Sequence, residues 1–288
     1  MKFSLNKLVI AAALVVPAMA MASVGGSGMI GGRHDFASAS SKFLYKQQVG
    51  GVVNTTANTV GLCSFCHTPH SAASTALLWN RAAPTQGYTW QDAPTTTGGT
   101  ALGITATYVG PTAKCLACHD GSVAVGDVGN YMGQSRSGLT GSLNAYKVGD
   151  RAAEGLGDLS PKVTKKVGAG GDMSGTHPVG VPYPFGQAVN TYNGVGTGAN
   201  VVLADYVAAP TVSSGSGTGA VTAGVKLYND TGTAITAGAV ATKTGIECSS
   251  CHDVHNKQSV DDNMLRGKQA GSSKADGYLC LQCHAKAD

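Results

Sequence analysis

One five-residue pattern contains every cysteine of this 288-residue chain. The pattern, Cys-x-x-Cys-His, occurs four times, beginning at Cys63, Cys115, Cys248 and Cys280, and uses all eight cysteines. Two thiols at this spacing lie on one side of a helical turn, and the histidine that follows directs its imidazole to the same place. This is the attachment signature of c-type haem, in which two thioethers hold one porphyrin and the histidine binds its iron.

Four such motifs with no cysteine left over predict four covalently attached haems c, and not disulfides or zinc sites. Each motif supplies two attachment residues and one proximal iron ligand. The predicted attachment residues are Cys63, Cys66, Cys115, Cys118, Cys248, Cys251, Cys280 and Cys283, and the predicted proximal ligands are His67, His119, His252 and His284.

The remaining histidines match the number of irons, which predicts bis-histidine ligation at all four. The predicted distal ligands are His34, His70, His177 and His255. Methionine is the competing distal ligand, and the candidates are Met29, Met132, Met173 and Met264. Met173 lies four residues before His177, so this segment offers either donor. A thioether–iron charge-transfer band in the oxidised optical spectrum would favour methionine.

Two of the distal candidates carry geometric information. His70 follows His67 by three residues, and His255 follows His252 by three. A histidine one turn beyond the proximal ligand stays on the same side of that porphyrin and cannot reach the opposite axial position of the same iron. If either is a ligand, it serves a different haem, and this arrangement draws haems into close pairs.

Composition supports a fold built around the porphyrins. Glycine is abundant, with 41 residues, while aromatic residues make up 6 % and charged residues 12 % of the chain. Large apolar side chains supply most burial energy, so an ordinary enzyme core is not expected. We expect a multihaem cytochrome c, mostly irregular or loop, with short helices at the motifs, a few short β-hairpins, and haems forming the core. The net charge of +4 predicts no nucleic-acid partner.

The N-terminus resembles an export signal. Lys2 and Lys7 flank a short positive region, an apolar run from Leu8 to Ala20 follows, and small-residue cleavage sites end at Ala20 and Ala22. We therefore expect a signal peptide over 1–22, export, and no membrane span. Residues 23–288 are expected to form one tetrahaem domain, with haems 1 and 2 in 23–150, a Gly/Ser/Thr-rich insert over about 178–246, and haems 3 and 4 in 247–288.

The remaining segments are interpreted as scaffold. Residues 225–228 and 233–236 predict a β-hairpin about a turn at 229–232, and residues 201–207 predict a further strand. The insert that contains them is expected to form a surface layer or a subunit contact. Trp79 and Trp90 are expected to pack on porphyrin faces. Arg81 is expected either to pair with a haem propionate or to be solvated.

Several longer stretches resemble a known family. Cys63-Ser-Phe-Cys-His-Thr-Pro-His70, Leu78-Trp-Asn-Arg81, Cys115-Leu-Ala-Cys-His-Asp-Gly121, Ser174-Gly-Thr-His-Pro178 and Cys248-Ser-Ser-Cys-His-Asp-Val-His255 resemble the multihaem cytochromes c of metal-respiring bacteria, most closely the OmcE-type tetrahaem extracellular cytochromes. The resemblance spans the motifs and is weak over 191–245.

This resemblance implies a homopolymeric filament with a continuous haem chain, in which one axial histidine comes from the neighbouring subunit. His70 is the first choice for that ligand and His34 the second. The implied function is extracellular electron conduction to redox partners and external acceptors, without substrate chemistry. The alternatives are a monomeric periplasmic shuttle and, less favoured, a multihaem reductase, which would need an iron with an open site.

Overall fold

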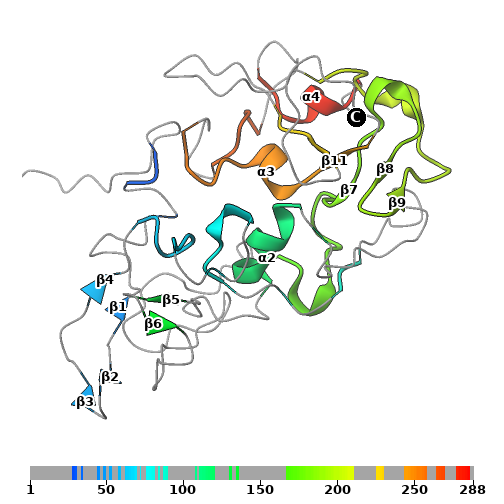
Figure 1. The fold of residues 1–288 in the computed structure, drawn as a ribbon. Coiled ribbons are helices and arrows are strands. Elements are labelled where there is room, and N and C mark those ends of the chain that lie inside the picture. Colours follow the sequence, from blue (N-terminus) through cyan, green and yellow to red (C-terminus); the bar gives the residue numbers. More distant parts are fainter. Residues whose placement is uncertain are drawn as a thin grey trace, which may run out of the picture.

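The fold was analysed in a computed structural model of the whole chain. It describes residues 28–30, 34, 62–69, 72, 76–81, 84, 87–89, 108, 110–120, 167–210, 225–229, 243–257, 264–269 and 277–285, and six two-residue strands between 44 and 135. In the part described, helices are short and sheets are small and antiparallel, as expected for a multihaem cytochrome c (Figure 1).

Every α-helix in the described residues contains a Cys-x-x-Cys pair. Helix α2 spans Thr112–His119, α3 spans Cys248–Cys251 and α4 spans Cys280–Cys283. The first motif forms a turn over residues 62–66. Single 3-10 turns occur at η1 (Ala76–Leu78), η4 (Ala169–Gly171), η5 (Phe185–Gln187) and η6 (Leu203–Asp205). In the described residues, α-helix is thus confined to the motifs, and the helices are short, as the sequence predicts.

The largest sheet in the described residues has three strands and leads directly into the third motif. β11 (Thr244–Ile246) lies between β10 (Tyr228–Asn229) and β7 (Val181–Pro182), antiparallel to both. Glu247 separates β11 from α3 and forms a reciprocal capping box with Ser250. The sheet therefore determines where the third motif begins.

A tight hairpin packs beside this sheet. β8 (Thr191–Tyr192) and β9 (Val195–Gly196) are joined by Asn193-Gly194, both with left-handed φ values, of 49° and 78°. Asn-Gly is the preferred pair for such a turn. Asn190 ties the hairpin to the sheet, because its side-chain amide donates to the carbonyls of Tyr183 (2.7 Å) and Thr244 (3.2 Å).

Three further strand pairs lie away from this sheet in Figure 1. β1 (Leu44–Tyr45) pairs with β4 (Asn58–Thr59), and β2 (Gln48–Val49) pairs with β3 (Val52–Val53). β5 (Asn130–Tyr131) pairs with β6 (Gln134–Ser135). Each pair is antiparallel and two residues long.

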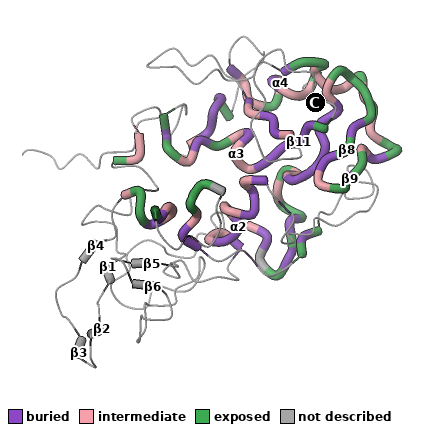
Figure 2. Tube along the Cα trace, in the orientation of Figure 1, coloured by how far each residue is buried: buried purple, intermediate pink, exposed green. Residues whose placement is uncertain are grey.

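Two apolar clusters pack against the motif helices. The first packs around Ala113 and Leu116 of α2, and the second contacts Cys283 of α4. Figure 2 shows buried chain running through α2, α3 and β11. Val179 contacts both clusters, so one continuous scaffold supports three motifs. The remaining buried members are Tyr88, Tyr108, Met173 and Val181 in the first cluster and Tyr183, Leu227 and Ile246 in the second.

Three predictions for the insert need correction or lie partly outside the described residues. The strand over 201–207 is wrong, because η6 turns the chain there through hydrogen bonds from Asp205 N to Val202 O and from Tyr206 N to Leu203 O. Strand β10 pairs with β11, while residues 230–236 of the predicted hairpin lie outside the described part. The insert is not merely a surface layer, because Tyr183, Tyr192 and Leu227 are fully buried in it.

In the described residues, no helix has both the length and the apolar character that a membrane crossing requires.

The contact between β11 and the β8–β9 hairpin yields a stability prediction. A Cβ added at Gly245 would lie 2.2 Å from Tyr192 Cδ1, whereas one added at Gly196 would meet nothing within 4 Å. Overpacking of this kind costs roughly 1–3 kcal/mol. We expect Gly245→Ala to lower the Tm in scanning calorimetry and the control Gly196→Ala to leave it nearly unchanged. Equal Tm values for the two variants would contradict this packing.

Candidate haem sites

Three motifs close with the same backbone hydrogen bond. The N–H of the histidine donates to the carbonyl of the first cysteine, from His67 to Cys63 (2.8 Å), from His252 to Cys248 (3.0 Å) and from His284 to Cys280 (2.9 Å). In the second motif the same residues lie within α2. This local bond brings two thiols and one imidazole together on one turn, which is the geometry expected from the spacing.

A short antiparallel bridge then fixes each of these three histidines. The bridges join His67 to Trp79, His252 to Leu265 and His284 to Tyr206. In every case the residue after the bridge partner donates its N–H to the carbonyl of the second cysteine, at 2.8–2.9 Å. The backbone around each imidazole is therefore held from both sides. The donors are Asn80 to Cys66, Arg266 to Cys251 and Val207 to Cys283.

Motifs 1 and 3 share further details, which make them two copies of one structural unit. Asn80 Nδ2 donates to Ser64 O at 2.8 Å, and Arg266 Nε donates to Ser249 O at 3.1 Å. Both serines directly follow the first cysteine of their motif. The residues before the bridge partners, Leu78 and Met264, both have left-handed φ, 50° and 59°. Each unit also carries an additional histidine three positions after the proximal one.

The four Cys pairs follow one another in space in the order of the sequence. Burial raises the pKa of Cys66 to about 12, with a further contribution from nearby Cys118. A hydrogen bond with Cys248 raises the pKa of Cys115, so motifs 2 and 3 touch at their first thiols. Burial, then Cys248 and Cys280, raises the pKa of Cys251 to about 11. No disulfide joins any of the eight cysteines, and they form a row that joins neighbouring motifs.

Six of the eight histidines lie in pairs with similar separations between ring centres. The imidazoles of His67 and His255 are 6.5 Å apart. Those of His119 and His34 are 6.2 Å apart, as are those of His284 and His177. Each pair combines one proximal histidine with one predicted distal histidine. As the geometric argument from sequence required, His255 faces the proximal histidine of a different motif.

These separations fit two imidazoles on opposite sides of one iron. A metal–imidazole nitrogen bond is about 2 Å long, so the two ring centres of such a pair lie about 6 Å apart once the ring radii are included. The ring planes meet at 53°, 25° and 70°, which is compatible because each ring can rotate about the shared axis.

The second ring nitrogens show how the imidazoles are oriented. His67 Nδ1 donates to the Leu77 carbonyl at 2.6 Å, and His177 Nδ1 donates to the Pro178 carbonyl at 2.9 Å. A proton on Nδ1 leaves Nε2 as the free donor for a metal. His34 hydrogen-bonds to the backbone of Val254, and burial lowers its pKa to about 4. Its imidazole is therefore neutral at neutral pH, as a metal ligand must be.

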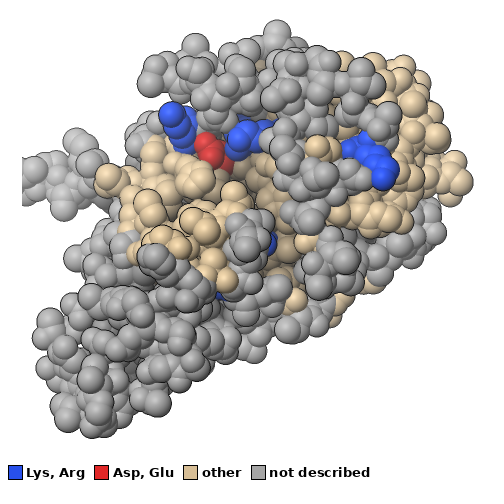
Figure 3. Space-filling model, in the orientation of Figure 1, with Lys and Arg blue, Asp and Glu red and all other residues tan. Residues whose placement is uncertain are grey.

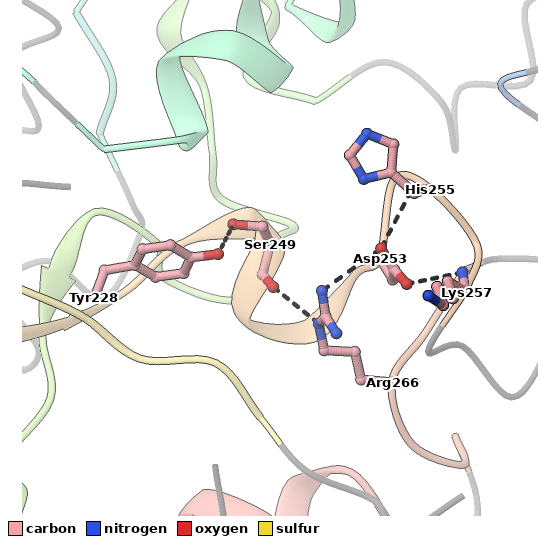
Figure 4. Close-up of polar contacts among 6 residues, drawn as sticks. All are labelled: Tyr228, Ser249, Asp253, His255, Lys257 and Arg266. Carbon is pink, nitrogen blue, oxygen red and sulfur yellow. Dashed lines mark hydrogen bonds and ion pairs between the residues drawn. The ribbon is translucent and has the colours of Figure 1, made fainter. Parts of the chain in front are cut away.

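One loop, residues 253–257, serves two of the histidine pairs (Figure 4). Asp253 accepts the N–H groups of His255 (3.2 Å) and Lys257 (2.8 Å) and so sets the turn that carries His255. Asn256 exchanges two hydrogen bonds with Gly28, from Gly28 N at 3.0 Å and from its own Nδ2 at 3.1 Å. These bonds anchor the N-terminal segment that brings His34 to His119.

Asp253 is held in turn by Arg266. The two side chains are buried, and Arg266 Nη2 lies 3.7 Å from Asp253 Oδ1. Burial lowers the pKa of Arg266, and Asp253 opposes that shift. Sequence reasoning missed this pair and also missed Glu247, which is fully buried between motifs 2 and 3. The local signal for Asp253 is an Asx-turn residue two positions before the second histidine, whereas nothing local indicates Arg266 or Glu247.

Of the other residues singled out from the sequence, some lie outside the described part and others have defined contacts. His70, Trp90 and Met132 lie outside the described residues. Met173 is buried in the cluster with Tyr88 and Leu116, while His177 faces His284. Trp79 stands edge-on to the His67 ring at 5.7 Å. Few charged side chains of the described residues are visible on the face drawn in Figure 3, and an acidic group there lies between basic ones.

The burial of Arg81 shows that one of its two expected environments, exposure to solvent, is wrong. It is only 1 % exposed and lies over the Phe65 ring at 5.0 Å, so it is not a solvated arginine. Stacking of a guanidinium on an aromatic face is a favourable arrangement, and it buries the cation beside the first motif.

A comparison with protein families supports the assignment of the Cys-x-x-Cys-His motifs as haem attachment motifs. Residues 239–288, which contain motifs 3 and 4, match the family model of the doubled CXXCH motif. A search of curated proteins found no match. The matching region is multihaem c-type cytochrome-like, with covalently bound c-type haem and a role in electron transfer.

The buried ion pair yields a prediction for the 253–257 loop. Removing one partner of a buried pair leaves an uncompensated charge, which costs about 3–5 kcal/mol. We expect Arg266→Met to destabilise the protein by that order, measured as the free energy of unfolding. The double variant Asp253→Asn/Arg266→Met should lose less than the sum of the single variants. Additivity within about 0.5 kcal/mol would show that the two side chains are not coupled.

Proposed function

We propose that this protein is an exported electron-transfer protein with four covalent haems, each held by two histidines, and that it polymerises into an extracellular filament. The observation that carries the ligation is the set of three imidazole pairs at 6.2–6.5 Å. Bound haem iron supplies reversible one-electron oxidation and reduction. The four motifs that use all eight cysteines support the count of four.

The chain's own residues support electron transfer over substrate chemistry. An imidazole on each side of an iron occupies both axial positions and leaves no place for a substrate. The bridges at His67, His252 and His284 hold the proximal side, and the 253–257 loop holds the distal side at two pairs. The row of thiols from motif 1 to motif 4 places the attachment points next to one another, as an electron path requires.

The fourth ligand pair follows from the two-copy relation of motifs 1 and 3. In the relation that the structure describes, the additional histidine of unit 3 faces the proximal histidine of unit 1. The same relation applied in reverse assigns His70 to the iron at His252. In the filament, His70 comes from the neighbouring subunit.

A surface feature next to motif 1 supports a subunit contact there. Leu77 and Leu78 are 62 % and 47 % exposed, and both have left-handed φ. Adjacent exposed leucines in such a backbone are unusual on a free surface. A neighbouring subunit that receives His70 would cover them.

The distal role of His255 can be tested in the optical spectrum. We expect His255→Ala to convert one of the four haems to a high-spin form that binds carbon monoxide, because the imidazole facing His67 is lost. The wild type and Lys257→Ala, in the same loop, should bind none. Added imidazole should restore the low-spin spectrum. A fully low-spin His255→Ala protein would contradict the assignment, and carbon monoxide binding by the wild type would favour a reductase.

The filament can be tested by electron microscopy of the secreted fraction. We expect filaments from the wild type and from the control Ser71→Ala, and none from His70→Ala, because each junction loses a ligand. Co-expressed His70→Ala subunits should shorten wild-type filaments, since they accept a histidine but donate none. Filaments that survive in His70→Ala would remove His70 from this role, and a monomeric wild type would favour the periplasmic shuttle.

A further inference from the structure

A fully buried carboxylate lies at the junction of motifs 2 and 3. Glu247 Oε2 accepts the backbone N–H of Thr112 at 2.9 Å. The Tyr108 hydroxyl lies 2.9 and 2.7 Å from its two oxygens, and the Tyr192 hydroxyl lies 2.5 Å from Oε1. These donors come from two segments that are far apart in the sequence, residues 108–112 and β8. The carboxylate therefore holds together α2, β8 and the start of α3.

The surroundings of Glu247 suit an anion although they contain no cation. In the part of the chain that the structure describes, its hydrogen-bond partners are neutral groups, and no Lys, Arg or His forms an ion pair with it. A backbone N–H can only donate, and two hydroxyls directed at the same carboxylate satisfy the lone pairs of an ionised group. Burial raises the pKa of Glu247, and the bonds from Thr112, Tyr192 and Tyr108 oppose that rise.

Close packing keeps this carboxylate away from water. A Cβ added at Gly110 would lie 2.1 Å from Glu247 Oε1, so the backbone passes directly over the carboxylate. Glu247 itself is 0 % exposed and Tyr192 is 1 % exposed. Buried charges without a partner ion are rare because desolvation is costly, so a retained one calls for a specific reason.

The position of Glu247 supplies that reason. It directly precedes Cys248, and Cys248 N donates to Thr112 Oγ1 at 3.0 Å, while Cys115 follows Thr112 by one helical turn. The negative charge of Glu247 acts on both thiols, since it raises the pKa of Cys115 and opposes the lowering of that of Cys248. The carboxylate is thus adjacent to the points where two porphyrins attach.

We propose that Glu247 is the buried anion that lowers the midpoint potentials of the haems attached through Cys115 and Cys248, and so creates a low-potential pair in the middle of the path. This inference rests on the proposed function. Reduction adds one electron from an electrode to each iron and removes one positive charge there. A nearby anion in a water-excluded site disfavours that added electron, and its effect is only weakly screened.

The test is a potentiometric titration of the full haem-loaded protein, followed by optical absorption. We expect Glu247→Gln to shift the low-potential half of the curve to more positive values and to leave the other half in place. Glu247→Asp, which keeps the charge, should stay close to the wild type. Glu154→Gln removes the only other glutamate of the chain and serves as the matched control, with an unchanged curve.

Each result separates this inference from the function on which it rests. Haem content measured in the same samples tests the four-haem assignment alone. If Glu247→Gln carries four low-spin haems and its curve is unchanged, the inference is wrong. An equal shift in Glu247→Asp and Glu247→Gln would also overturn it, because packing and not charge would then be responsible.

A measurement on the wild type covers the case in which Glu247→Gln fails to fold. Because the chain has two glutamates, ¹³C-glutamate labelling gives only two carboxyl signals in the infrared spectrum. We expect a labelled carboxylate band that shifts as the low-potential half is reduced. A labelled band of a protonated carboxylic acid in both redox states, with no shifting carboxylate band, would show that Glu247 is not an anion and would overturn the inference.

Discussion

In the described residues, three imidazole pairs have ring centres 6.2–6.5 Å apart, and the backbone contacts around them maintain this spacing. A Cys-x-x-Cys-His turn can present one imidazole by itself, because one backbone hydrogen bond inside the motif directs it. The opposing imidazole must come from elsewhere in the chain. The bridges at His67, His252 and His284 support the imidazoles of the motifs, and the loop over 253–257 supports opposing ones.

The loop over 253–257 shows how few residues such support requires. Asp253 shapes the turn that carries His255 to motif 1, and Asn256 anchors the segment that carries His34 to motif 2. The loop itself begins directly after the proximal histidine of motif 3. One short segment thereby connects three motifs. A substitution at Asp253 would therefore displace both His255 and His34, which are predicted ligands of two different irons. This coupling explains the placement of a buried ion pair at its base.

The features that could be predicted from the sequence are those governed by neighbouring residues. The motif helices follow from spacings of three or four residues. The assignment of the proximal histidines rests on the same spacings and stays a prediction, as does the rule that His255 serves another motif if it is a ligand. The pairing of His67 with His255 does not follow from these spacings, because it depends on contacts made far along the chain. The strand expected over 201–207 failed for a similar reason: its apolar residues suit a strand, but η6 forms there and only a single bridge, from Tyr206 to His284, pairs this segment. The Asn193-Gly194 turn was readable from the sequence and was overlooked.

The low fraction of charged residues in this chain also explains why the single carboxylate of Glu247 has a large electrostatic effect on its surroundings. Charged residues make up 12 % of the chain, and no Lys, Arg or His among the described residues forms an ion pair with Glu247. The tyrosines of the insert then act as more than packing, since Tyr192 closes over Glu247 and donates to it. Removing the insert would expose this carboxylate to water and weaken its field at both thiols. The insert over about 178–246 therefore contributes, in the proposed path, to the electrostatics at motifs 2 and 3.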